Sequence, residues 1–220
     1  MDVAILIMEI IGTIAFAFSG AMVGIQKKFD LFGVIVLGMT TSVGGGLIRD
    51  LLIGNHPPKM FQHPLYAMLG IVISIITFFV VYFQKNMTTK YWIRFGQLMF
   101  LFDTVGLGIF TVMGVTTAID AGFLNNYFLQ IFVGILTGVG GGLLRDIMAR
   151  NLPYIFVKHI YACACLLGSI SFILVNSVMG QLAAMIVGAL MVILIRLLAS
   201  YYKWNLPRIQ SLDIEETGVL

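Results

Sequence analysis

Residues 41–50 read TSVGGGLIRD, and residues 137–146 read TGVGGGLLRD. The two stretches are 96 residues apart, counted from Gly44 to Gly140, and both lie in strongly apolar sequence. Each glycine weakens a helix by roughly 1 kcal/mol relative to alanine, and charged residues at membrane depth are costly and usually functional. The duplicated motif therefore predicts a membrane protein of two related halves with a broken helix in each.

The composition supports this fold class. The 220 residues are 60% hydrophobic and 10% charged, with a mean hydropathy of +1.01. These values exclude an ordinary soluble globular domain. Apolar runs of about 20 residues are long enough to cross a bilayer as helices. We therefore predict an all-α integral membrane protein with seven transmembrane helices, at about 3–26, 31–54, 65–83, 95–118, 127–150, 159–177 and 180–202.

The similarity between the halves extends beyond the glycine motif. A series of four residues in the first span recurs in the fourth: Glu9, Gly12, Phe16 and Gly20 match Asp103, Gly106, Phe110 and Gly114. Three helices per half is an odd number, so the second half enters the membrane from the opposite side. We predict a three-helix repeat over 3–83, an inverted repeat over 95–177, a seventh helix over 180–203 and a cytoplasmic tail over 204–220. Inverted repeats commonly place a binding or permeation site near the midplane, at interrupted helices.

The glycine triplets allow two interpretations. Small residues let helices pack closely, but three adjacent glycines point in different directions, so one neighbouring helix does not explain all three. This favours a break or kink in the second and fifth helices, at the predicted pore or kink positions Gly44, Gly45, Gly46, Gly140, Gly141 and Gly142. Thr41, Ser42 and Thr137 precede the triplets. Their hydroxyls either line a pore or cap backbone groups freed by the break.

Six ionisable residues lie at membrane depth: Glu9, Arg49, Asp50, Asp103, Arg145 and Asp146. Adjacent residues on a helix do not face each other, so each arginine is expected to pair with a carboxylate on another helix. Matching depths predict the interhelical pairs Glu9–Arg49 and Asp103–Arg145. Such pairs brace the bundle, line a polar path, or do both. We expect Arg196, near the end of the seventh span, to extend its guanidinium to the membrane surface.

The basic residues are divided unequally between the predicted loops. With the N-terminus outside, nine of them lie on the inner side and only Lys59 lies on the outer side; the nine are Lys27, Lys28, Lys85, Lys90, Arg94, Arg150, Lys158, Lys203 and Arg208. Cytoplasmic loops of membrane proteins carry such an excess. We predict that the N-terminus is outside and the C-terminus cytoplasmic. The basic inner face should attract anionic membrane lipids; nucleic acid is not an expected partner.

The duplicated GGGxxRD, with Glu9 and Asp103 ahead of GxxxFxxxG, resembles the trimeric intracellular cation channel family in its prokaryotic branch. That branch overlaps a group named for a putative glycine transporter. The resemblance covers roughly residues 3–207. It implies a homotrimer with a pore through each protomer, kinks at both glycine triplets, and conduction of monovalent cations, K⁺ and possibly Na⁺. Many relatives carry aspartate where this chain has Glu9. The lack of the long charged tail of animal relatives indicates the plasma (inner) membrane of a prokaryote.

A potassium channel is therefore the leading functional hypothesis, and a secondary transporter of a small amino acid such as glycine is the alternative. A transporter needs a polar cavity with separate sites for ammonium and carboxylate, whereas a channel needs a continuous narrow path with weak sites. The sequence contains no catalytic motif, no metal-ligand cluster and no cofactor-binding motif. We therefore expect no enzyme activity, no metal and no cofactor.

The charge distribution generates a topology prediction. A cysteine introduced at position 125 should react with a membrane-impermeant reagent added outside, whereas one at position 87 should be spared. Cysteine labelling of intact cells measures both. The reverse labelling pattern would contradict the predicted orientation of the two halves.

Overall fold

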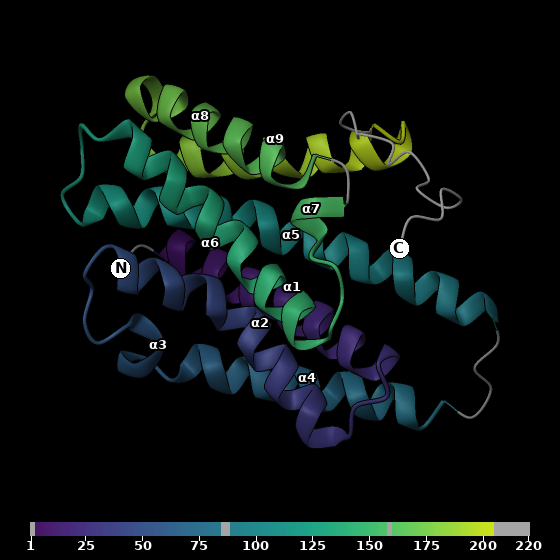
Figure 1. Ribbon diagram of the computed structural model, residues 1–220. Helices are drawn as coiled ribbons and strands as arrows, with labels where there is room; N and C mark the ends of the chain where they lie inside the picture. Colours follow the sequence, from purple (N-terminus) through teal and green to yellow (C-terminus); the bar gives the residue numbers. More distant parts are fainter. Residues whose placement is uncertain (1–2, 85–88, 158–159, 205–220) are drawn as a thin grey trace, which may run out of the picture.

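The computed structural model describes residues 3–84, 89–157 and 160–204, and these residues form an all-α bundle (Figure 1). Seven helices in the described ranges are long and apolar enough to cross a membrane. They are α1 (Val3–Gln26), α2 (Leu31–Leu52), α4 (Leu65–Tyr82), α5 (Thr89–Asp120), α6 (Tyr127–Met148), α8 (Tyr161–Met179) and α9 (Gln181–Tyr201). Two short helices, α3 (Lys59–Gln62) and α7 (Tyr154–Val157), follow α2 and α6. The predicted fold class of seven spanning helices is confirmed.

The helix ends follow local sequence signals. Asp30 caps α2 by accepting a hydrogen bond from the Gly33 amide (2.7 Å), and Asn126 caps α6 in the same way. Such side chains satisfy amides that lack a partner in the first turn. Helix α5 begins at Thr89, six residues before the predicted start. No glycine or proline lies between 89 and 95, so the helix continues past the end of the apolar run.

Parts of two sequence predictions lie outside the described residues. Residues 85–88 belong to the predicted cytoplasmic loop, and 205–220 make up nearly all of the predicted cytoplasmic tail. Lys158, one of the predicted inner basic residues, and residue 159, the predicted start of the sixth span, also lie outside the described residues.

The helices of the two halves pack side by side. Figure 1 shows α4 at one side of the bundle and α8 with α9 at the other, with α1, α2, α5 and α6 between them. The same small-residue contact occurs in each half. A Cβ at Gly20 would collide with the hydroxyl of Thr41, and a Cβ at Gly114 would lie 2.6 Å from the hydroxyl of Thr137. Small residues thus bring α1 onto α2 and α5 onto α6 in equivalent ways.

The glycine triplets do not break their helices. Both α2 and α6 run through their triplets as unbroken α-helix, so the prediction of broken helices is wrong. The two helices cross here instead. A Cβ at Gly45 would overlap the carbonyl oxygen of Thr137, and a Cβ at Gly141 would overlap that of Thr41. The glycines are needed for close backbone approach, and the packing of α2 against α6 offsets their poor helix propensity.

This crossing predicts different effects for two neighbouring glycines. Gly45→Ala should lower the free energy of unfolding by about 1–3 kcal/mol, because the added methyl overpacks the crossing. Gly46→Ala is the matched control: its Cβ would lie 3.6 Å from the Arg49 guanidinium, an ordinary contact. Unfolding of the purified protein in detergent measures both changes. Equal losses for the two variants would contradict the proposed role of Gly45 in the crossing.

Candidate functional site

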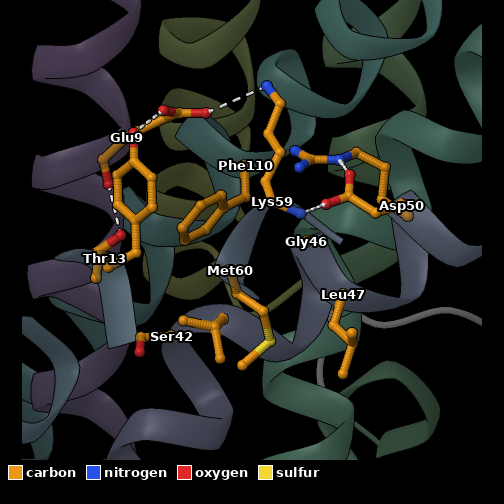
Figure 2. A pocket seen from close by; sticks show the side chains of 12 residues that line it. Glu9, Thr13, Ser42, Gly46, Leu47, Asp50, Lys59, Met60 and Phe110 are labelled. Atoms are coloured by element: carbon orange, nitrogen blue, oxygen red, sulfur yellow. Dashed lines mark hydrogen bonds and ion pairs between the residues drawn. The ribbon is translucent and has the colours of Figure 1, made fainter. Parts of the chain in front are cut away.

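An open cavity with about 40 Å³ of water-accessible space lies where α1, α2, α3, α4 and α5 meet. We call it the Glu9 cavity. Figure 2 shows its polar side chains around an apolar wall that includes Phe110 and Met60. The lining residues are Glu9, Thr13, Ser42, Val43, Gly46, Leu47, Arg49, Asp50, Lys59, Met60, Tyr66 and Phe110.

The carboxylate of Glu9 is the main acidic group of this cavity. It accepts a hydrogen bond from the Tyr66 hydroxyl, and the Lys59 ammonium lies 4.0 Å away. The hydroxyl of Thr13 donates to the backbone carbonyl of Glu9 (2.7 Å). Lys59 is about one-third exposed, whereas Glu9 is nearly buried. Glu9 is therefore a largely desolvated carboxylate whose cationic neighbour remains in contact with water.

Arg49 does not pair with Glu9, and the predicted ion pair between them is wrong. Its Nε donates to Oδ1 of the adjacent Asp50 at 2.8 Å. The other carboxylate oxygen of Asp50 accepts from the backbone amide of Lys59, also at 2.8 Å. The side chain of an arginine is long enough to bend back to its neighbour, and the start of α3 holds that neighbour's carboxylate in place. The expectation that adjacent residues would not pair failed for this reason.

The second motif copy repeats this arrangement. Arg145 Nε donates to Asp146 Oδ1 at 2.9 Å, and Asp146 Oδ2 accepts from the amide of Tyr154 at 3.0 Å. In each half, the Arg–Asp pair thus ties the end of a spanning helix to the short helix that follows. The available sequence signal was the proline at 57 and at 153, which in each half follows the end of the spanning helix by five residues and shortly precedes the short helix.

Arg145 also makes the predicted pair with Asp103, at 2.6 Å, and that prediction is confirmed. The same nitrogen donates to the Ser19 hydroxyl at 2.6 Å. Arg196 of α9 binds the second oxygen of Asp103 at 3.0 Å. We call Ser19, Asp103, Arg145, Arg196 and Tyr161, whose ring stacks on Arg196, the Asp103 cluster. All five side chains are buried.

Arg196 is buried, contrary to the prediction from the sequence. It was expected to reach the membrane surface, but it is 3% exposed, and its guanidinium carbon lies 4.5 Å from the ring centre of Tyr161 and 5.0 Å from that of Phe100. Aromatic faces attract cations, most strongly where water is excluded. The other arginine of the cluster, Arg145, also binds a second buried carboxylate, that of Asp146. Only the tertiary neighbours distinguish this arginine from one that extends to the surface.

The hydroxyl residues ahead of the triplets separate into two groups. Thr41 and Thr137 donate to carbonyls four residues earlier in their own helices, at 2.6 Å, and both are fully buried. They therefore neither cap a broken helix nor line the Glu9 cavity. Ser42, by contrast, lines the cavity. Gly46 also lines the cavity, whereas the other five predicted glycines do not: Gly44, Gly45, Gly140, Gly141 and Gly142.

Known proteins resemble this chain along most of its length. The family model described as "Glycine transporter" matches residues 6–82 and 100–177. A UPF0126 membrane protein of Deinococcus radiodurans is 36% identical over 191 residues, covering 86% of this chain and 84% of that protein. The UPF0126 inner membrane protein YadS of Escherichia coli K12 is 34% identical over 214 residues, covering 96% and 97%.

Solved structures agree with these matches. The crystal structure of a prokaryotic TRIC channel in 0.5 M KCl is 33% identical, with a TM-score of 0.83, and the match covers 94% of this chain and all of that one. The TRIC trimeric intracellular cation channel orthologue from Rhodobacter sphaeroides is 28% identical, with a TM-score of 0.82 and coverage of 92% and 100%. This chain belongs to the prokaryotic branch of the TRIC family.

Within this TRIC protein, the two acid sites predict unequal stability effects. Asp103→Ala leaves the buried Arg196 without a carboxylate and should cost about 3–5 kcal/mol of unfolding free energy, whereas Arg145 keeps Asp146. Adding Arg196→Leu should recover part of that loss, because it removes the unpaired charge. Glu9→Ala is the matched control with a smaller expected loss, since its cationic neighbour Lys59 is about one-third exposed. Unfolding in detergent measures all three variants, and a larger loss for Glu9→Ala than for Asp103→Ala would contradict the assignment.

Proposed function

We propose that this protein is a cation channel whose path in each protomer includes the Glu9 cavity. The observation that carries the proposal is the position of Glu9, a carboxylate at the wall of an open cavity formed inside one chain. A cation leaving water needs oxygen atoms to replace its hydration shell. The cavity offers the carboxylate of Glu9 together with hydroxyls of Thr13, Ser42 and Tyr66.

The position of Lys59 fits a site that conducts cations better than a site that binds them tightly. Its ammonium lies 4.0 Å from Glu9 and competes with an entering cation for that carboxylate. Conduction requires sites that bind strongly enough for entry and weakly enough for exit. A neighbouring cation on a flexible, partly exposed side chain weakens binding in this way.

The proposal extends to the conducted ions, the assembly, the membrane and the topology of the protein. We propose that the conducted ions are monovalent, K⁺ and possibly Na⁺, and that the protein is a homotrimer with one path per protomer. The solved relative described as a trimeric channel supports the assembly. The relative described as an inner membrane protein supports the plasma membrane of a prokaryote as the location. We propose an outside N-terminus, with anionic lipids bound at the basic cytoplasmic face.

The second candidate function is transport of a small amino acid such as glycine. One feature favours it: the lining of the Glu9 cavity includes an acid, Glu9, and two cations, Lys59 and Arg49. A zwitterion needs such opposite charges for its ammonium and its carboxylate. The description of the matching family model points the same way. Arg49 is already bound to Asp50, which leaves Lys59 as the main candidate for the carboxylate.

Liposomes containing the purified protein distinguish the two functions. As a channel, the protein should pass K⁺ under an applied voltage without accumulating labelled glycine. Glu9→Gln should lower K⁺ conductance several-fold, because it removes the charge while keeping the shape of the side chain. Asp120→Asn is the matched control, an exposed acid outside the cavity lining. Gradient-driven glycine uptake with no K⁺ current would contradict the channel proposal.

A further inference from the structure

The Glu9 cavity and the Asp103 cluster occupy equivalent places in the two halves. Glu9 and Asp103 match in sequence, as do the two Arg–Asp motifs. The tyrosines match too: Tyr66–Ala67 recurs as Tyr161–Ala162, 95 residues later. The packing of the following residues supports this register. A Cβ at Gly38 would collide with the hydroxyl of Ser74, and a Cβ at Gly134 would lie 2.7 Å from that of Ser169, again 95 residues on.

The two equivalent sites differ in the partner of the tyrosine. In the first half, the Tyr66 hydroxyl donates to Glu9. In the second half, Asp103 binds two arginines instead, and within the described chain the buried hydroxyl of Tyr161 has no hydrogen-bond partner. The first site opens into a cavity, whereas the side chains of the second are closed against one another and buried.

Two contacts make this difference. Arg145 binds Asp103, whereas its counterpart Arg49 binds Asp50 and not Glu9. Arg196 comes from α9, the helix outside the two repeats, so it has no counterpart in the first half. Its guanidinium binds the second oxygen of Asp103 and covers the ring of Tyr161, so it occupies both the acid and the tyrosine that are bonded to each other in the equivalent site.

The closed cluster is incompletely satisfied. Among the described residues, Arg145 Nη2 and Arg196 Nε are buried donors without partners, as is the Tyr161 hydroxyl. Buried donors of this kind raise the free energy of the state that holds them. An arrangement that exposes them to water relieves that cost, so the cluster has a physical reason to open.

We propose that Arg196 is a latch that closes a second cation site, equivalent to the Glu9 cavity. When Arg196 leaves Asp103, the hydroxyl of Tyr161 donates to Asp103, as that of Tyr66 donates to Glu9, and the second half opens. The proposal rests on the proposed channel function for its ion. A path through the protomer then requires both acid sites to be accessible, and α9 controls the second one.

Cys165 is a natural reporter of this opening. Its thiol is buried and lies 3.5 Å from the carbonyl oxygen of Tyr161. Cys165 lies one helical turn after Tyr161 and packs in the same buried cluster as Tyr161 and Val192 of α9. A movement of Arg196 that opens the surroundings of Tyr161 should therefore bring water-soluble reagents to Cys165. Cys163→Ala makes it the single cysteine of the chain.

The experiment measures the rate at which a small cationic thiosulfonate modifies Cys165 in the purified Cys163→Ala protein. Arg196→Met keeps the length of the side chain and removes its charge; it should raise the rate about tenfold or more by shifting the population toward the open form. Arg196→Lys should stay closer to the parent. Leu197→Met, on the adjacent, partly exposed position, is the matched control and should leave the rate unchanged.

A further, double variant separates opening of the Asp103 cluster from a general loss of packing. Adding Tyr161→Phe to Arg196→Met removes the hydroxyl that replaces the latch, so the labelling rate should fall back toward that of the parent. An unchanged rate in Arg196→Met overturns the latch. A fast rate that Tyr161→Phe does not reduce, or that Leu197→Met shares, overturns it as well, because it indicates loss of packing.

The labelling test is independent of ion flux. If Cys165 labelling responds as expected but liposomes show no K⁺ current, the channel function fails while the latch stands. If K⁺ current is present and Arg196→Met leaves labelling unchanged, the latch fails while the channel function stands.

Discussion

Each guanidinium that is buried among the described residues has a carboxylate beside it, and this constraint organises the bundle. An unpaired charge at membrane depth is costly. Arg49 and Arg145 each meet the constraint first with the next residue in the chain, through Asp50 and Asp146. Because these aspartates also accept the backbone amide that starts a short helix, the same contacts neutralise the arginines and fold the chain back after the span.

The close crossing of α2 and α6 is the second organising feature. It brings the two glycine triplets together, with Gly45 against the backbone of Thr137 and Gly141 against that of Thr41. Bare backbone at Gly45 and Gly141 permits contacts that any side chain would block. The triplets thus stabilise the fold through packing, although they weaken each helix taken alone. In a membrane interior, helix association depends on packing and not on the hydrophobic effect, so close packing can outweigh the low helix propensity of glycine.

The two halves use related residues to reach different states. The glutamate of the first half bonds a tyrosine at an open cavity, whereas the aspartate of the second half is surrounded by two arginines. Part of the difference comes from Arg145, which binds Asp103 although Arg49 does not bind Glu9, and part from α9, which supplies Arg196 to one half only. A seventh helix added to two repeats thereby makes the bundle asymmetric at its charged sites. For the proposed channel this asymmetry matters, because a path that is open at Glu9 and closed at Asp103 conducts ions only when the Asp103 cluster opens.

The sequence by itself determined the seven spans, the duplication of the motif and the pairing of Asp103 with Arg145. These follow from apolar length, from repeated letters and from the cost of a buried charge, which are all properties that can be read along one chain. Only the tertiary structure decided that the glycine triplets pack and do not break, that Arg49 turns to Asp50, and that Arg196 is buried. Each of these depends on which neighbour lies within a few ångströms: the carbonyl of Thr137 at Gly45, the amide of Lys59 at Asp50, and the ring of Tyr161 at Arg196. A glycine or an arginine permits several such arrangements equally well, and the packing of distant helices selects one of them.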